Sequence, residues 1–390
     1  MAPLHIILVM IEPPLPFGNA AARWYYVLLK GLVQRGHRVT AFAACGNPDD
    51  IDQAAKLFPA PGYDLRCFAF PERQGLRAKW QTLRQPFSYV FSDELRTAVK
   101  AELAADFDVL HLEMMWSGWL GLDHTKRALL NLHYLYEIDW QDAPNLTAGE
   151  RRRRRHLLRA ERSLLRRYPY VRTLTPRLTK RVQELHPSVL AETVPLGLDA
   201  LLYEFRPAGR PAAVPTVGLV GSFNWGPTHS AGMRLVNRLW PEIKRQVPAA
   251  RLLIVGREAR TALKEFVDRP DVEINENVPD IAPHLRCMNV MLYAPGRGSG
   301  MKVKVLESMA LGIPVVTTSE GVEGLSAVDG VQTGISDDDA GLIERTVALL
   351  NDPERAAQQS KAARTLIETD CDPDAALDAI ERMYQRINTE

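Results

Sequence analysis

The chain has 390 residues, which is enough for two domains of ordinary size. Hydrophobic residues make up 46% and charged residues 24%, which is typical of a globular protein and excludes long disorder or a fibrous repeat. Lys and Arg number 48 against 47 Asp and Glu, so no overall basic field points to nucleic acid. The four cysteines are widely spaced, which argues against a zinc site and against a disulfide framework.

No segment approaches the ~18 consecutive apolar residues that a membrane-spanning helix needs. Residues 1–10 lack the basic start of a signal peptide, so the predicted location is the cytoplasm.

Short apolar segments alternate with longer segments of helical periodicity in the first half of the chain. Residues 4–11 predict a buried strand, residues 20–35 a helix and residues 39–44 the next strand. Further strands are predicted over residues 109–112 and 128–133. Apolar strands separated by helices are typical of a parallel sheet with helices on its faces.

A second series of the same kind follows Pro215. Its predicted strands cover residues 217–221, 252–256, 272–276, 290–294 and 314–318, with a helix over residues 231–246. Residues 194–215 are rich in Pro and Gly and are predicted to be a linker. We therefore predict an α/β protein with two Rossmann-like, doubly wound domains, residues 1–195 and 196–370, that face a cleft. Residues 371–390 are predicted to hold a C-terminal helix that can cross back to the first domain.

A glycine-rich turn followed by a helix stands out at residues 298–312, GSGMKVKVLESMALG. The pattern predicts a helix from about Gly300 to Leu311, with Lys302 in its first turn. Small residues allow the backbone to approach a ligand, and the N–H groups at a helix start can hold an anion. Lys302 suits a phosphate, and Glu307 is near enough to reach a ribose. From spacing alone, a plain surface turn with a solvated pair of lysines is an equal alternative.

With three further segments, this motif resembles the retaining, nucleotide-sugar-dependent glycosyltransferases of the GT-B fold, specifically the family 4-like (group 1) enzymes. The matching segments are residues 217–225 (VGLVGSFNW), residues 253–256 together with 277–281, and residues 194–199 (VPLGLD) followed by Phe205. The resemblance is densest over residues 194–325.

The resemblance implies roles by position in the second half of the chain. Glu307 would hold the ribose hydroxyls, and Lys302 with Lys304 would neutralise the diphosphate. The other residues expected around the donor are Gly221, Ser222, Asn224, Val278, Ser299, Gly300 and Met301. Many relatives carry a Glu at the position of Ser299, so the backbone of Gly300 and Met301 is expected to contact the sugar in its place.

In the first half, Gly18 and Asn19 lie between the first predicted strand and helix. The resemblance implies that their backbone meets the transferred sugar or its phosphate, and a plain helix start is the alternative. His133 ends an apolar strand, where α/β proteins place functional side chains. It matches a His that contacts sugar or acceptor in related transferases, so we expect His133 and Lys302 to be catalytic. A hydrogen-bonded structural histidine is the other interpretation of His133.

Arginines recur at helical spacing along residues 151–166 and include Arg151, Arg155 and Arg159 on one face. This face is either solvated or docks onto an anionic membrane or an acidic acceptor. In the second case the protein would be peripheral at the inner face of the membrane.

The resemblance implies a retaining hexosyltransferase that moves a sugar from a UDP- or GDP-sugar to a hydroxyl of a saccharide, lipid-linked or small-molecule acceptor. No DxD-like pair ends a predicted cleft strand, so no metal and no other cofactor are expected. Lys302 and helix N–H groups would neutralise the departing diphosphate. The alternatives are a GT-B-fold sugar-nucleotide epimerase and a non-catalytic nucleotide- or sugar-binding module. A dehydrogenase is disfavoured because no GxGxxG follows either first strand.

Overall fold

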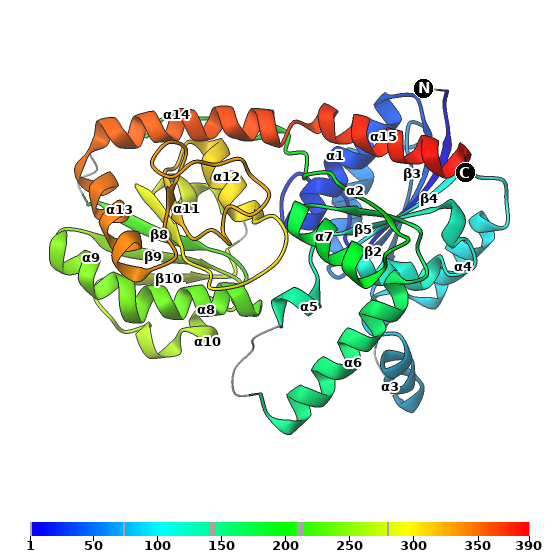
Figure 1. The fold of residues 1–390 in the computed structure, drawn as a ribbon, viewed down its shortest axis with the longest axis horizontal. Coiled ribbons are helices and arrows are strands. Elements are labelled where there is room, and N and C mark those ends of the chain that lie inside the picture. The colour runs from blue at the N-terminus through cyan, green and yellow to red at the C-terminus, as the bar shows by residue number, and fades with distance from the viewer. Residues whose placement is uncertain (1, 73–74, 141–145, 209–213, 279–280, 390) are drawn as a thin grey trace. The chain divides into compact units, whose positions relative to one another are not determined.

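The computed structural model describes residues 2–72, 75–140, 146–208, 214–278 and 281–389. Contacts between residues divide the chain into two units. The first unit consists of Met1–Leu198 with Asp372–Glu390, and the second unit consists of Asp199–Cys371. Each unit is built on one parallel sheet, with seven strands in the first and six in the second (Figure 1).

The sheet of the first unit has the strand order β3-β2-β1-β4-β5-β6-β7. Its strands are β1 (His5–Met10), β2 (Arg38–Cys45), β3 (Asp64–Ala69), β4 (Val109–Glu113), β5 (Ala128–Leu132), β6 (Tyr170–Thr173) and β7 (Leu190–Thr193). Strand β1 lies between β2 and β4, with Ile6 opposite Val39 and Val109. The strand order therefore reverses beside β1, and functional side chains are expected at the carboxyl ends of the strands there.

The helices of this unit pack on the sheet or extend away from it. They are α1 (Ala20–Gln34), α2 (Asp49–Leu57), α3 (Gly75–Arg84), α4 (Asp93–Leu103), α5 (Tyr136–Asp139), α6 (Ala148–Leu165), α7 (Pro176–Leu185) and α15 (Pro373–Thr389). The C-terminal helix α15 packs against α1 and reaches β4 and β5 (Figure 1). Arg35, which follows α1, pairs with three carboxylates of α15, from Asp374, Asp378 and Glu381.

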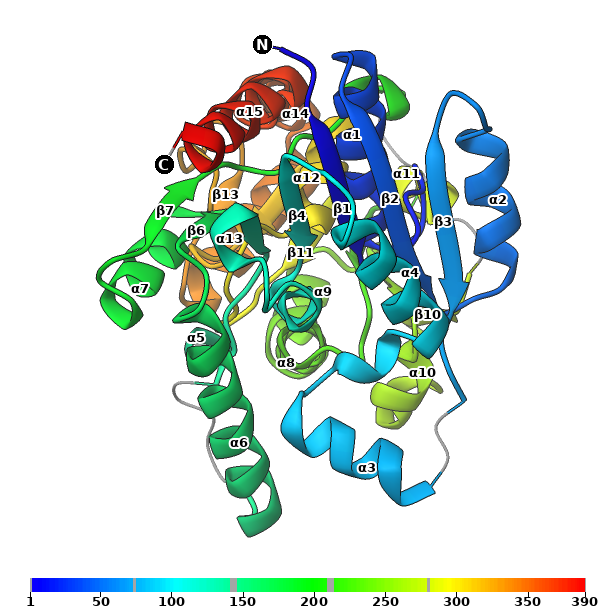
Figure 2. The ribbon, with the colours of Figure 1, turned by 90° about the vertical axis from the view of Figure 1, so that its right-hand side faces the viewer.

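Helices α3 and α6 extend away from the sheet of the first unit (Figures 1 and 2). Helix α6 begins at a capping box, in which Thr147 and Glu150 satisfy each other's backbone N–H groups. Its inner side buries Leu157, Leu164 and Leu165. The helix predicted from the arginine spacing is therefore confirmed.

The sheet of the second unit has the order β10-β9-β8-β11-β12-β13, which reverses beside β8. Its strands are β8 (Thr216–Val220), β9 (Arg251–Gly256), β10 (Val272–Glu276), β11 (Val290–Tyr293), β12 (Val315–Thr317) and β13 (Gly334–Ile335). The five strands predicted for this half are confirmed. The helices are α8 (Gly226–Arg234), α9 (Trp240–Gln246), α10 (Ala259–Ala262), α11 (Ala282–Arg286), α12 (Val303–Leu311), α13 (Asp339–Asn351) and α14 (Pro353–Asp370).

The helix predicted over residues 231–246 starts earlier than expected. It begins as α8 at Gly226 and passes through a π-helical turn, Leu235–Leu239, into α9. Pro227 does not prevent this start, because a proline in the first turn removes an N–H that has no partner within the helix. None of the described helices combines the length and the apolar composition required to cross a bilayer.

Candidate functional site

The glycine-rich segment between β11 and α12 bends sharply before the helix begins. Gly298 and Gly300 have φ of 138° and 78°, in the region that glycine adopts readily and other residues avoid. Lys302 is the N-cap residue with φ −100°, and α12 begins only at Val303. The prediction of a helix from about Gly300, with Lys302 in its first turn, is therefore wrong. The left-handed torsions at the glycines are incompatible with helix.

Lys302 is held by the turn that precedes it. Its Nζ donates to the carbonyls of Gly298 and Gly300, and it lies 3.5 Å from the carboxylate of Glu323. The residue is only 9% exposed. The ammonium is therefore fixed at the start of α12, and Glu323 offsets part of its charge.

Lys304 is half-buried in α12 and faces the loop that follows β8. Its Nζ donates to Thr228 Oγ1 at 2.6 Å and sits 4.3 Å from the centre of the Tyr293 ring. A Cβ at Gly221 would lie 2.6 Å from this Nζ, so a side chain there would displace the ammonium. Burial, with a smaller effect from the charge of Lys302, lowers the pKa of Lys304 to about 7.

The loops that follow β8, β9 and β10 contact one another, and Gly221 in the first of them adjoins Lys304. Ser222 Oγ donates to Asn224 Oδ1 at 2.7 Å, and the backbone N–H of Phe223 donates to the carbonyl of Arg257 at 2.9 Å. Val278, just after β10, is half-buried. Pro279 and Asp280 of the matched segment 277–281 lie outside the described residues.

Glu307 points from α12 toward the segment that enters the second unit. It is 6% exposed, and Oε1 accepts a hydrogen bond from the Tyr203 hydroxyl at 2.9 Å. Ser299 and Met301 are buried in the preceding turn. Of the predicted donor residues, Gly221, Ser222 and Asn224 follow β8, Ser299, Gly300, Met301 and Lys302 follow β11, and Lys304 and Glu307 lie in the first two turns of α12.

His133 belongs to a buried cluster in the first unit, centred on Glu113. The Glu113 carboxylate ends β4 and is fully buried. It receives hydrogen bonds from Trp24 Nε1 at 2.9 Å, Asn131 Nδ2 at 2.6 Å, His111 Nε2 at 3.0 Å and His133 Nε2 at 2.9 Å.

The surroundings of Glu113 decide its charge. Burial alone would raise its pKa, but the hydrogen bonds from His111 and His133 hold the pKa well below its usual value. Glu113 is therefore an ionised acceptor that fixes the His133 ring. Sequence reasoning missed this residue, although a polar residue that ends an apolar strand is the same signal that singled out His133.

Gly18 and Asn19 lie at the start of α1 in the first unit. Asn19 is the N-cap, and its Oδ1 accepts from the backbone N–H of Ala22 at 2.9 Å. Gly18 has φ 87°. The side chain of Asn19 therefore caps helix α1, and a ligand at this turn would contact its backbone.

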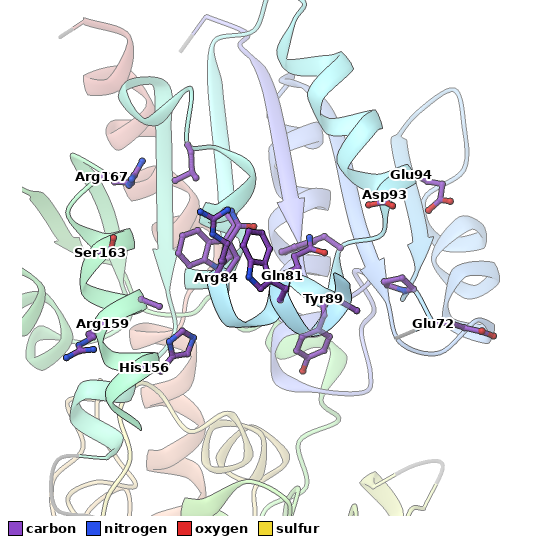
Figure 3. Close-up of a pocket in the computed structure, with 18 residues that line it drawn as sticks. Glu72, Gln81, Arg84, Tyr89, Asp93, Glu94, His156, Arg159, Ser163 and Arg167 are labelled. Atoms are coloured by element: carbon purple, nitrogen blue, oxygen red, sulfur yellow. The ribbon is translucent and has the colours of Figure 1, made fainter. Parts of the chain in front are cut away.

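A hollow of about 1070 Å³ lies between α3, α4 and α6 of the first unit (Figure 3). His156, Arg159, Ser163 and Arg167 line the α6 side. The opposite side carries the acidic side chains of Glu72, Asp93 and Glu94, and aromatic side chains of Trp80, Tyr89 and Trp119 also line the hollow. Of the three singled-out arginines only Arg159 lines the hollow, while Arg151 and Arg155 are exposed nearer the helix start.

Across the described part of the chain, no three His, Cys, Asp or Glu side chains come together in a way that could hold a metal ion.

Comparison with protein families identifies both units. Residues 21–197 match the model described as a glycosyl transferase 4-like domain, and residues 214–352 match the model described as glycosyl transferases group 1. Together the two matches span most of the chain. The chain belongs to the group 1 glycosyl transferases. The resemblance to the group 1, family 4-like glycosyltransferases that the motifs predicted is thus confirmed. No curated protein matches the chain significantly.

Solved structures similar to this group 1 glycosyltransferase cover its whole length. HepE from Anabaena, in complex with UDP and glucose, is 13% identical with a TM-score of 0.69 and covers 98% of this chain and 100% of its own. Sucrose-phosphate synthase from Thermosynechococcus elongatus is 18% identical with a TM-score of 0.72 over 98% and 99% of the two chains.

WaaG, a glycosyltransferase involved in lipopolysaccharide biosynthesis, is 15% identical with a TM-score of 0.61 over 97% and 99% of the two chains. These similarities confirm the predicted GT-B fold with two Rossmann-like units.

Proposed function

We propose that this group 1 glycosyltransferase moves a sugar from a UDP- or GDP-sugar to an acceptor hydroxyl with retention of anomeric configuration. The observation that supports the proposal most is the placement of Lys302 at the N-cap of α12 and of Lys304 and Glu307 within the first two turns of that largely buried helix. HepE, whose fold is similar, was crystallised with UDP and with UDP-glucose, which supports a nucleotide-sugar donor.

In this proposal Glu307 accepts hydrogen bonds from the two ribose hydroxyls. A carboxylate has about four acceptor positions, so Glu307 can bind the ribose and keep its bond to Tyr203. Val278 would lie beside the base. Ser299, Gly300 and Met301 would contact the sugar through the buried turn that their backbone forms.

The diphosphate would lie against Lys302, Lys304 and the N–H groups at the start of α12. Gly221, Ser222 and Asn224 would enclose it from the β8 side, because Gly221 adjoins Lys304. Charge on the leaving diphosphate grows in the transition state, so these cations contribute most there. On this basis the transfer needs no metal and no other cofactor.

His133 would contact the sugar or acceptor, oriented by Glu113, and the backbone of Gly18 and Asn19 would meet the sugar or its phosphate. In the proposed front-face route the acceptor hydroxyl attacks C1 from the side on which the diphosphate leaves. The C1–O bond to phosphate breaks as the new C1–O bond forms, and the departing phosphate oxygen takes the hydroxyl proton.

We also infer that Arg151, Arg155 and Arg159 dock the first unit on an anionic membrane or an acidic acceptor, as in a cytoplasmic, peripheral protein. All three are exposed on α6. Arg162, one turn further, has a structural contact instead. Its Nε and Nη2 donate to the two carboxylate oxygens of Glu137 at 2.9 and 2.8 Å.

The test is incubation with a panel of UDP- and GDP-linked sugars, with and without candidate saccharide and lipid-linked acceptors. We expect release of the nucleoside diphosphate from one donor and transfer of its sugar. Conversion of the donor into an epimer would identify an epimerase instead. Tight nucleotide binding without any turnover would identify a binding module.

A further inference from the structure

A continuous line of buried hydrogen bonds joins the C-terminal helix α15 to His133. The Tyr384 hydroxyl lies 2.5 Å from His111 Nδ1, and His111 Nε2 lies 3.0 Å from Glu113 Oε1. The other oxygen of the same carboxylate, Glu113 Oε2, lies 2.9 Å from His133 Nε2. Tyr384, His111 and Glu113 are fully buried.

The positions of the protons in this line follow from the protonation states of Glu113 and Tyr384. Glu113 is ionised and can only accept, so the Nε2 atoms of both His111 and His133 must carry a proton and donate it. Burial, followed by the negative charge of Glu113, raises the pKa of Tyr384 well above its usual value. The phenol therefore stays protonated and donates to Nδ1 of a neutral His111.

The charges of the cluster support a neutral His111. Arg172 is fully buried, stacks on Trp24 with its guanidinium 4.3 Å from the ring centre, and donates to the Pro195 carbonyl at 2.8 Å. Burial lowers its pKa to about 10, so Arg172 remains a cation at neutral pH. Within this cluster the Arg172 cation thus balances the Glu113 carboxylate, and a further proton on His111 would leave an unbalanced buried charge.

We propose that Tyr384 is a positioning residue for His133, acting through His111 and Glu113. By donating to His111 Nδ1, Tyr384 selects the tautomer of His111 that donates to Glu113. Glu113 then holds His133 with its proton on Nε2, which makes Nδ1 the basic nitrogen of the neutral ring. The contribution of Tyr384 to the reaction rests on the role proposed above for His133, whereas the tautomers of the two histidines do not.

Nitrogen NMR of the full-length protein labelled at histidine tests the assignment directly. In the wild-type protein at neutral pH, we expect His111 and His133 to show the Nε2–H tautomer. In Tyr384→Phe, His111 loses its donor and should exchange between tautomers, and the His133 signals should shift. Tyr168→Phe is the matched control, because Tyr168 is an equally buried tyrosine of the same unit that donates to the Gly118 carbonyl.

An Nδ1–H tautomer of either histidine in the wild-type protein would overturn the proposal, even if the Tyr384→Phe variant did not fold. Histidine signals in a folded Tyr384→Phe identical to those of the wild-type protein would also overturn it.

Activity provides a second measurement for the same variant. Loss of one buried hydrogen bond is expected to lower kcat by about tenfold, while KM for the donor and affinity for the nucleoside diphosphate stay unchanged. Loss of nucleotide affinity in Tyr384→Phe, or an unchanged kcat, would contradict a positioning role. If the wild-type protein transfers no sugar, the proposed function fails, and the NMR result still decides whether the hydrogen-bond line exists.

Discussion

Glu307 is the residue whose substitution should affect donor binding most. Its carboxylate already accepts a hydrogen bond from Tyr203, and in our proposal it also accepts from the ribose. Losing hydrogen bonds to a charged group costs about 1.5–3 kcal/mol, so Glu307→Ala should bind the nucleoside diphosphate roughly ten- to a hundredfold more weakly. Calorimetric titration measures this loss, and Glu354→Ala, at an exposed position of α14, is the control. An intact Glu307→Ala with wild-type affinity would place the donor elsewhere.

Lys304 should take up a proton when the diphosphate binds. Its pKa is lowered to about 7 in the unliganded protein, so a large fraction of the ammonium is deprotonated at about pH 7.5. A nearby phosphate favours the charged form and raises the pKa, so the sign of the exchange is uptake from solvent. Calorimetry in two buffers of different ionisation enthalpy measures this uptake, and Lys304→Met should abolish it. Equal apparent enthalpies in both buffers for the wild-type protein would contradict the prediction.

Candidate site residues could be predicted from the sequence where they lie close together in one motif. Lys302, Lys304 and Glu307 lie within one short motif, and the structure places them at the N-cap and within the first two turns of α12. Their partners were not predictable, because they come from distant segments. Tyr203 is 104 positions from Glu307, and Tyr384 is 273 positions from His111.

At the scale of elements, α6 presents a dense row of exposed arginines whose removal should leave the fold intact. If Arg151, Arg155 and Arg159 meet anionic lipid, reversing all three to Glu should abolish co-sedimentation with phosphatidylglycerol vesicles and leave donor hydrolysis unchanged. Because the attraction is electrostatic, wild-type binding should also weaken as salt is raised.

The matched control for this surface reverses three exposed cations of α14 and α15, Arg355, Lys361 and Arg382, which changes the net charge equally. The control should still sediment with the vesicles. If the wild-type protein does not sediment, or the α6 variant sediments as well as the wild-type protein, the arginine face is simply solvated.

Apolar strands were the elements that sequence predicted best, because a buried parallel strand is hydrophobic on both faces. Strands β3, β6, β7 and β13 were missed. Strand β3 is only half-buried, and β6 includes Arg172, a fully buried arginine that interrupts the apolar pattern. The start of α12 was predicted too early because helical periodicity does not reveal the positive φ of Gly300.

For the molecule as a whole, donor turnover should survive the removal of divalent metal. Two lysines and the start of α12 are proposed to neutralise the diphosphate, so the same rate is expected in EDTA and in added magnesium or manganese. The measurement is the release of nucleoside diphosphate after dialysis against EDTA. Loss of turnover that either metal restores would show that a metal carries this charge.

The stereochemistry of the first product tests the proposed reaction most directly. A UDP- or GDP-linked α-sugar is incubated with the protein in an NMR tube, with water or an added alcohol as acceptor, and the anomeric proton of the new species is followed from the earliest times. Retention predicts that the first product is the α-anomer, and that Glu307→Ala forms it more slowly than the wild-type protein at donor concentrations below the dissociation constant of the variant. A β-anomer as first product, or a donor that remains unchanged across the whole nucleotide-sugar panel, would contradict a retaining glycosyltransferase.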